Sequence, residues 1–416
     1  MCKIDLSSTL TSYSNISVNA VTISTDGITA IVNSIKDMPI FDGVKGQLMD
    51  YCSPLHSTRP YSVSIEKITG IMSKVLENIK QPEMASFYAG WIKFEGLLSI
   101  CGVRDHFVHN FETFLLGAYL LQVFRQSYIG WVPTDHDLNE IVFGWVLASG
   151  FHDLGYAVEK YNDIGKNLAE LFGKYGLNSI VDQVKSLELN EKALEELYAL
   201  NLGPGAHPDK GAINLRLILL DELCSQLQLG SEDADDALHK LGNPLGHGLA
   251  GCCLLLKEII KEKGFSFIGT GSGSIVMASA IAILLHHHGH LKGLKISLKS
   301  VPLLAMLIIC DEIQEWNRPA PGGGMSYKLE SISSKYVGTD LNLVVTISVE
   351  AAGLPEDKIV ESVKKSLCTK KSKLDSVAGS FWGEKASTSI GIQLNVVRHG
   401  KNVDSITIKD LIKGSK

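Results

Sequence analysis

The sequence predicts a mainly α protein in which a helical bundle domain, residues 61–318, is followed by a small α+β domain, residues 325–416. From about residue 62 onward, apolar side chains recur at the spacing of one helix face. After residue 324 the apolar residues alternate with polar ones, which favours strands. The stretch PAPGGG, residues 319–324, separates the two patterns. Because Pro and Gly do not continue a helix, we interpret it as a linker.

Residues 1–60 are rich in Ser, Thr and Ile and poor in charge, so we expect mixed structure there, packed on the helical domain. The first clear helix is SIEKITGIMSKVLENIK, whose apolar residues fall at 65, 68, 71, 72, 75, 76 and 79. Further helices are predicted at 84–100, 105–126, 137–152, 157–174, 191–200, 209–228, 244–262, 273–288 and 301–316.

The predicted C-terminal domain combines strands with one helix. YKLESISSKYV and LNLVVTISVEA indicate two strands, and residues 355–367 indicate a helix. SIGIQLNVV and VDSITI then indicate a hairpin that turns at RHGKN. A sheet with a helix on one side is the α+β arrangement.

Composition limits the function classes. The chain has 416 residues, of which 45% are hydrophobic and 20% charged, with a net charge of −6. This favours a globular protein and argues against an extended nucleic-acid surface. The longest apolar runs, 275–285 and 301–310, fall short of the roughly 20 residues of a membrane span. We expect a cytoplasmic protein with no membrane partner, because MCKIDLSSTLTSYSN lacks the apolar region of a signal peptide.

The eight cysteines form no CxxC pair, so we expect buried, reduced thiols. Histidines are more informative, because eleven of the thirteen lie between residues 106 and 290, within the helical region. Several of them stand where an apolar helix ends or beside a carboxylate.

The first two histidine clusters each allow two interpretations. In RDHFVHNFETFLLGAYLL, Asp105 and His109 are four residues apart and share a helix face, although a helix-start cap explains Asp105 equally well. His152 and Asp153 end a strongly apolar helix. Burying such a pair is costly unless a partner such as a divalent cation matches both side chains. The alternative is a capping histidine with an exposed aspartate.

The later histidine clusters and Asp311 also allow more than one interpretation. His247 starts an apolar helix, where a hydrogen-bonded core histidine is the simpler interpretation. In AILLHHHGH, residues 282–290, successive side chains point about 100° apart, so three histidines cannot face one ion. His286 is our first choice as a ligand, and His287 is next, reaching either metal or substrate. Asp311 follows a long apolar run, so we expect it to be more buried than Glu312 and to need a partner, either Arg318 or a metal.

The order His…His-Asp…His…His…Asp on successive helices resembles the HD superfamily of metal-dependent phosphohydrolases. The resemblance covers roughly residues 100–318 and is carried by His109, His152-Asp153, His247, His286 or His287, Asp311 and the ending DEIQEW. It implies an HD-type helical bundle.

Two extra histidines between His152-Asp153 and Asp311 match the binuclear subset of that superfamily, which includes HD-GYP phosphodiesterases and diiron oxygenases. The resemblance implies that one metal is held by His109, His152 and Asp311, with Asp153 as a bridge. A second metal would be held by His247 with His286 or His287. Asp105 stands where some HD-GYP proteins place an additional carboxylate ligand.

The sequence departs from the HD-GYP pattern in two places. GHLKG follows the histidine run where GYP is expected, and Tyr156 stands where a lysine is common. Both differences put activity on cyclic di-GMP in doubt.

The resemblance implies a phosphohydrolase that cleaves a phosphodiester, phosphoanhydride or phosphomonoester bond of a small phosphorylated molecule, with a nucleotide as the favoured substrate. Its cofactors would be two divalent ions, Mn, Fe, Mg or Zn, and the nucleophile a hydroxide between them. Asp153 and His287 would be catalytic, and Arg318 would hold substrate phosphates. A diiron oxygenase on the same ligands and a non-catalytic nucleotide sensor are the alternatives. Homo-oligomerisation is left open.

Overall fold

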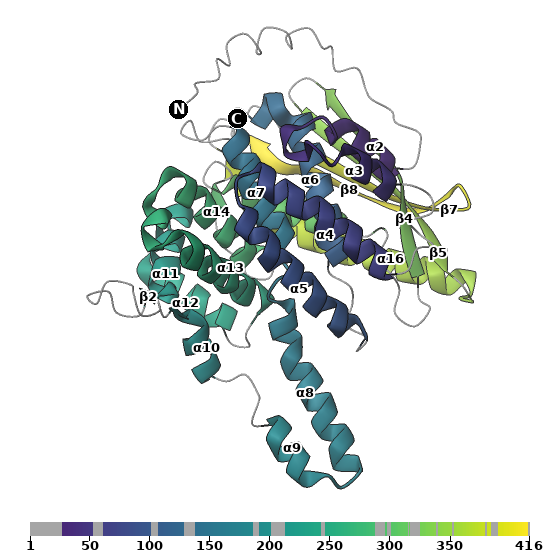
Figure 1. Ribbon diagram of the computed structural model, residues 1–416. Coiled ribbons are helices and arrows are strands. Elements are labelled where there is room, and N and C mark those ends of the chain that lie inside the picture. The colour runs from purple at the N-terminus through teal and green to yellow at the C-terminus, as the bar shows by residue number, and fades with distance from the viewer. Residues whose placement is uncertain are drawn as a thin grey trace.

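The computed structural model describes residues 27–52, 61–100, 107–128, 138–185, 191–200, 213–242, 246–287, 296–297, 301–314, 316, 325–337, 340–351, 353–378, 381–383 and 390–414. The linker predicted at 319–324 and the predicted site residues Asp105 and Arg318 lie outside this part of the chain. Within it the protein is mainly helical, with one small sheet toward the C-terminus (Figure 1).

The first described segments are helical. They comprise α2 (Gly27–Ile35), the short 3-10 helix η1 (Pro39–Phe41) and α3 (Lys45–Tyr51). Helix α2 contacts both α6 (Phe107–Tyr128) and β4 (Met325–Val337), while α3 contacts α4 (Tyr61–Asn78). Gly27 is required where α2 meets the sheet, because a Cβ there would lie 2.4 Å from Leu329 Cγ. These helices were not predicted, because their apolar faces are short and residues 1–60, rich in Ser, Thr and Ile, show no clear helical spacing.

The helices of the central region run from residue 61 to residue 313. They are α4 (Tyr61–Asn78), α5 (Pro82–Ile100), α6 (Phe107–Tyr128), α7 (Leu138–Phe151), α8 (Tyr156–Lys174), α9 (Asn178–Lys185), α10 (Glu191–Tyr198), α11 (Leu215–Leu227), α12 (Ser231–Gly242), α13 (His247–Lys263), α14 (Gly271–Leu285) and α15 (Pro302–Ile313). A 3-10 helix, η3 (Phe265–Gly269), joins α13 to α14.

Helices α7, α14 and α15 form the centre of this region. Each of these helices has apolar side chains on all of its faces, as expected for a helix that is buried on all sides. Helix α14 contacts α7, α13 and α15. Gly117 allows α6 and α7 to approach closely, because a Cβ there would lie 2.0 Å from the Trp145 ring. The Trp145 indole donates a hydrogen bond to Phe114 O at 3.0 Å, which fixes this crossing.

Three predicted helix boundaries are wrong for identifiable reasons. Residues 199–200 form β1 (Ala199–Leu200), which pairs with β2 (Ile213–Asn214), so tertiary pairing ends α10 early. The helix predicted at 209–228 begins only at Leu215, after the Asn214 side chain caps it. The helix predicted at 355–367 extends to Ala378 as α16 (Glu356–Ala378).

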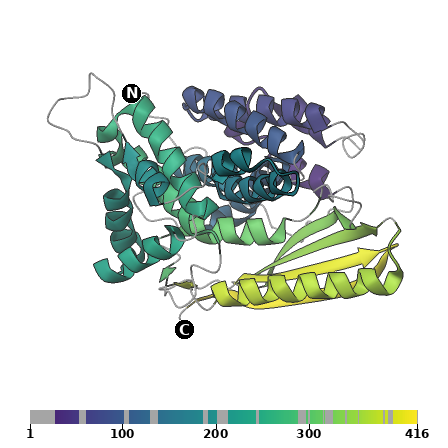
Figure 2. The same cartoon turned by 90° about the horizontal axis from the view of Figure 1, so that it is seen from below.

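The C-terminal sheet is mixed, with strand order β3-β6-β8-β7-β5-β4. Its strands are β3 (Ile296–Ser297), β4 (Met325–Val337), β5 (Asp340–Ala351), β6 (Phe381–Gly383), β7 (Ile390–Arg398) and β8 (Lys401–Gly414). The pairs β4–β5 and β7–β8 are antiparallel, whereas β5 and β7 are parallel because α16 connects them. Figure 2 shows α16 lying along this sheet, below the helices of the central region.

Helix α16 packs against one face of the sheet. On β5 the side chains at 343, 345, 347 and 349 are buried, the alternation expected of a half-buried strand. Helix α16 contributes Ile359, Val363, Leu367 and Leu374 to the same core. Among the residues that the structure describes, no helix combines the length and apolar character that crossing a membrane requires.

Candidate metal centre

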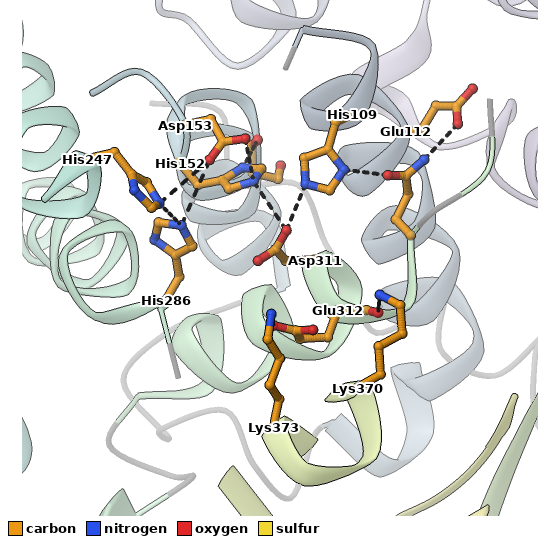
Figure 3. A network of polar contacts seen from close by, with 12 residues as sticks. His109, Glu112, His152, Asp153, His247, His286, Asp311, Glu312, Lys370 and Lys373 are labelled. Atoms are coloured by element: carbon orange, nitrogen blue, oxygen red, sulfur yellow. Dashed lines mark hydrogen bonds and ion pairs between the residues drawn. The ribbon is translucent and has the colours of Figure 1, made fainter. Parts of the chain in front are cut away.

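The predicted ligands that the structure describes converge at the inner ends of several helices (Figure 3). His109 lies in the first turn of α6, and His152 and Asp153 follow the last residue of α7. His247 begins α13, His286 caps the C-terminus of α14, and Asp311 lies in the last turn of α15. Residues that stand far apart in the sequence thus form one cluster in space.

Asp153 is shared by two groups of three potential metal ligands. His109, His152 and Asp153 form one group, and Asp153, His247 and His286 form the other. Within each group the potential ligand atoms lie within 4.8 Å of one another. Such groups have the residue types and spacing that can hold a divalent ion.

The two carboxylate oxygens of Asp153 face different histidines. Oδ2 lies 3.6 Å from His152 Nε2, whereas Oδ1 lies 3.8 Å from His247 Nε2 and 4.0 Å from His286 Nε2. One carboxylate therefore joins the two groups (Figure 3). This is the arrangement of a carboxylate that can bridge two cations.

Asp311 belongs with the first group. Its Oδ1 lies 2.7 Å from His109 Nε2 and 3.8 Å from His152 Nε2. Contrary to expectation, its side chain is 23% exposed, while that of Glu312 is only 10% exposed. Glu312 is the more buried of the two because α16 covers it, which the sequence around residue 311 does not reveal.

The four clustered histidines use Nδ1 for contacts outside the centre. His152 Nδ1 lies 2.9 Å from Ser149 O, and His286 Nδ1 lies 2.7 Å from Ile283 O. The other two contact side chains: His247 Nδ1 lies 2.7 Å from Glu159 Oε2, and His109 Nδ1 contacts Gln314 Oε1. Each of these partners is an acceptor, so each Nδ1 carries the proton.

The centre is consequently lined by hydrogen-bond acceptors. With Nδ1 protonated, a neutral imidazole turns the lone pair of Nε2 toward the centre, where the Asp153 and Asp311 carboxylates also lie. His247 Nε2 and His286 Nε2 lie only 3.0 Å apart. Buried lone pairs and carboxylates that face one another are unfavourable unless protons or cations lie between them. The residues present therefore fit divalent metal ions.

When no cation is bound, the pKa values of the clustered histidines shift in different directions. Burial lowers the pKa of His152, but Asp153, Asp311 and the Ser149 carbonyl together raise it to about 9. The pKa of His247 is also raised, because hydrogen bonding to Glu159 and the charge of Asp153 outweigh burial. Burial, together with His247 and His152, lowers the pKa of His286 to about 3. The cluster thus holds protons where cations would be bound.

Small residues bring His247 to this position. A Cβ on Gly155, at the start of α8, would lie 2.0 Å from His247 O and 2.4 Å from Gly251 N. A Cβ on Gly248 would lie 2.7 Å from Leu284 O, next to the end of α14. Glycine at both positions lets α13 approach the residues that follow Asp153 and those that precede His286.

A buried hydrogen-bond chain leads from His109 to the N-terminal helices. Gln314, which contacts His109 through Oε1, donates from Nε2 to Glu112 Oε2 at 3.0 Å and to Trp316 O at 2.8 Å. Glu112 Oε1 accepts from the Tyr51 hydroxyl at 2.8 Å. Sequence reasoning missed Tyr51, Gln314 and the Glu159 partner of His247, because only long-range packing places them.

The remaining predicted site residues are Asp105, Arg318 and His287. Asp105 and Arg318 lie outside the described residues. His287 is exposed, and its ring centroid lies 6.3 Å from that of His247. It belongs to neither group of potential ligands, so His286, our first choice, is the residue that reaches the centre. Burial, His247 and Lys373 lower the pKa of His287.

Comparisons of the chain with protein-family models, with curated proteins and with solved structures found no match.

Proposed function

We propose that the protein is a metal-dependent phosphohydrolase of the HD type, acting on a phosphate ester or anhydride bond of a small molecule, with a nucleotide as the favoured substrate. The observation that carries the proposal is the place of Asp153 in both ligand groups, with one carboxylate oxygen toward each. A lone capping histidine or a core hydrogen bond does not require this arrangement.

His109, His152 and Asp311 would hold one cation, His247 and His286 the other, and Asp153 both. When bound, two such cations lower the pKa of a water between them and offset charge that develops on phosphoryl oxygens. The acceptors on each Nδ1 keep the rings turned inward and increase the basicity of each Nε2. Asp311 lies on the side of the centre that solvent reaches, where a substrate would enter.

His287 and Arg318 remain proposed substrate contacts. His287 is exposed next to the cluster and directly follows the C-cap of α14, so its ring can approach a bound molecule. Arg318 follows α15 by a few residues and is proposed on its position in the sequence alone.

The proposal is tested by loading the purified protein with Mn²⁺ and measuring hydrolysis of bis-p-nitrophenyl phosphate and of a panel of nucleotides under anaerobic conditions. We expect turnover that Asp153→Asn lowers at least about a hundredfold, because both ligand groups lose a charge. Asp221→Asn, at an exposed position on α11, is the matched control and should leave turnover unchanged. Full turnover in Asp153→Asn contradicts the proposal.

The same assay separates the alternatives. Oxygen consumption by the iron-loaded protein, with no anaerobic hydrolysis, would instead assign a diiron oxygenase. Tight nucleotide binding without turnover in any metal would assign a sensor.

A further inference from the structure

Helix α16 of the C-terminal domain contacts α15 directly beside the candidate metal centre. Two of its lysines reach the same residue: Lys370 Nζ donates to Glu312 O at 2.6 Å, and Lys373 Nζ lies 2.9 Å from Glu312 Oε1. Glu312 immediately follows Asp311 in the chain. The C-terminal domain is therefore attached next to a proposed ligand.

Lys370 serves as the anchor of this contact. It is only 7% exposed and occupies a position of the apolar stripe that α16 turns toward the sheet. The Glu312 carbonyl lies in the last turn of α15, where carbonyls lack partners within the helix and attract cations. This bond sets the position of α16 on α15.

Lys373 lies three residues further on the same face of α16, so the anchor also places its side chain. Figure 3 shows Lys373 extending from α16 toward the carboxylates of Glu312 and Asp311. Its charge is also felt at His287, whose pKa it helps to lower.

Lys373 and Asp311 are both partly exposed, unlike three of the clustered histidines. The side chains of His109, His152 and His286 are at most 3% exposed, so the centre is closed behind them. By contrast, Asp311 is 23% and Lys373 is 31% exposed. Both side chains are thus within reach of a molecule that approaches from solvent.

We propose that Lys373 binds a phosphoryl oxygen of the substrate, so that the C-terminal domain supplies part of the substrate site. The inference rests on the proposed phosphohydrolase function and extends it to this domain. An ammonium group can hold more than one acceptor, and its charge attracts phosphate without a fixed geometry. The bond from Lys370 to the Glu312 carbonyl keeps α16 in place, and the Glu312 carboxylate would offset part of the charge of Lys373 before substrate binds.

A purely structural role of the ion pair, which would only dock α16 on α15, makes a different prediction. It would change the stability of the protein without changing its affinity for an anion. Anion affinity, measured separately from turnover, therefore distinguishes the two roles.

The test uses the Mn²⁺-loaded full chain with inorganic phosphate as the probe, measured by isothermal titration calorimetry. Lys373→Met keeps the aliphatic stem and removes the charge, and we expect phosphate to bind about tenfold more weakly. Lys371→Met is the matched control, because Lys371 is exposed on α16 and pairs with Asp375. Metal content and thermal midpoint are measured for each variant.

Equal phosphate affinity in Lys373→Met and Lys371→Met overturns the inference, as does absence of phosphate binding to the loaded wild-type protein. Glu312→Gln provides a second measurement with the opposite sign. It removes the negative charge beside Lys373 and should tighten phosphate binding, whereas weaker binding in this variant also counts against the inference. Hydrolysis by the wild-type protein decides the proposed function independently of these affinities.

Discussion

The Nε2 atoms of His247 and His286 lie 3.0 Å apart, and each ring has its Nδ1 directed at an acceptor elsewhere. Two neutral imidazoles in this arrangement turn lone pairs toward one another. The contact is favourable only when a proton or a cation lies between them.

His286→Ala should therefore remove one bound metal ion. We expect the wild-type protein to bind about two Mn²⁺ ions per chain and this variant about one, because the group of His109, His152 and Asp153 remains intact. Inductively coupled plasma mass spectrometry after dialysis measures the ratio. The control is His239→Ala, at an exposed position of α12. An unchanged ratio in His286→Ala would show that this histidine is not a ligand.

Metal binding should become weaker as the pH falls. The pKa of His152 in the metal-free protein is about 9, because Asp153 and Asp311 outweigh its burial, so at pH 7 it carries a proton that a metal must displace. Affinity should fall about tenfold for each pH unit below that value if one proton is displaced. Calorimetry in buffers of different ionisation enthalpy counts the protons released. Binding without proton release contradicts the prediction.

The same protonation stabilises the metal-free fold. The pKa of His152 is higher in the folded protein than its ordinary value of 6.5. Its contribution to the free energy of unfolding is therefore fully present below pH 6.5 and is lost as the pH rises through about 9. Urea unfolding of the metal-free protein across this range measures the loss.

The hydrogen-bond chain behind His109 should control metal affinity from a distance. Tyr51→Phe removes the hydroxyl that donates to the buried Glu112, which in turn accepts from Gln314. We expect metal affinity to fall about tenfold, the lower end of the effect of outer-shell partners, and stability to fall by about 1–3 kcal/mol. Tyr175→Phe, at a residue 75% exposed, is the control. Wild-type affinity in Tyr51→Phe would show that the chain does not orient His109.

The sequence was sufficient to predict which histidines and aspartates gather in one cluster and insufficient to predict the residues that contact them from outside it. Taken singly, His109 and His247 suit a helix cap or a core hydrogen bond, and it was the order His…His-Asp…His…His…Asp, with its resemblance to the HD superfamily, that grouped them with Asp311. Tyr51 and Glu159 lack any such signal, since they reach the centre only through contacts between distant segments.

The second half of α16 was not predicted either, because its pattern depends on a contact with another helix. Lys370 stands where the spacing of Ile359, Val363 and Leu367 calls for an apolar residue, so the periodicity that predicts the helix breaks there. In the structure, the lysine head is matched by the Glu312 carbonyl on another helix. A contact between α16 and α15 thus completes a pattern that is incomplete within α16 itself.

Gly155→Ala should displace α8 from α13 and thereby disturb the second ligand group. The added Cβ would lie 2.0 Å from His247 O and 2.4 Å from Gly251 N, and both are backbone atoms that cannot move aside cheaply. We expect the free energy of unfolding to fall by about 1–3 kcal/mol and metal content to fall toward one ion per chain. Urea unfolding and metal analysis of the same preparation measure both effects. Gly70→Ala is the control, because a Cβ there meets nothing within 4 Å and a helix interior favours alanine over glycine. Wild-type stability and metal content in Gly155→Ala would mean that α8 and α13 do not pack closely enough to position His247.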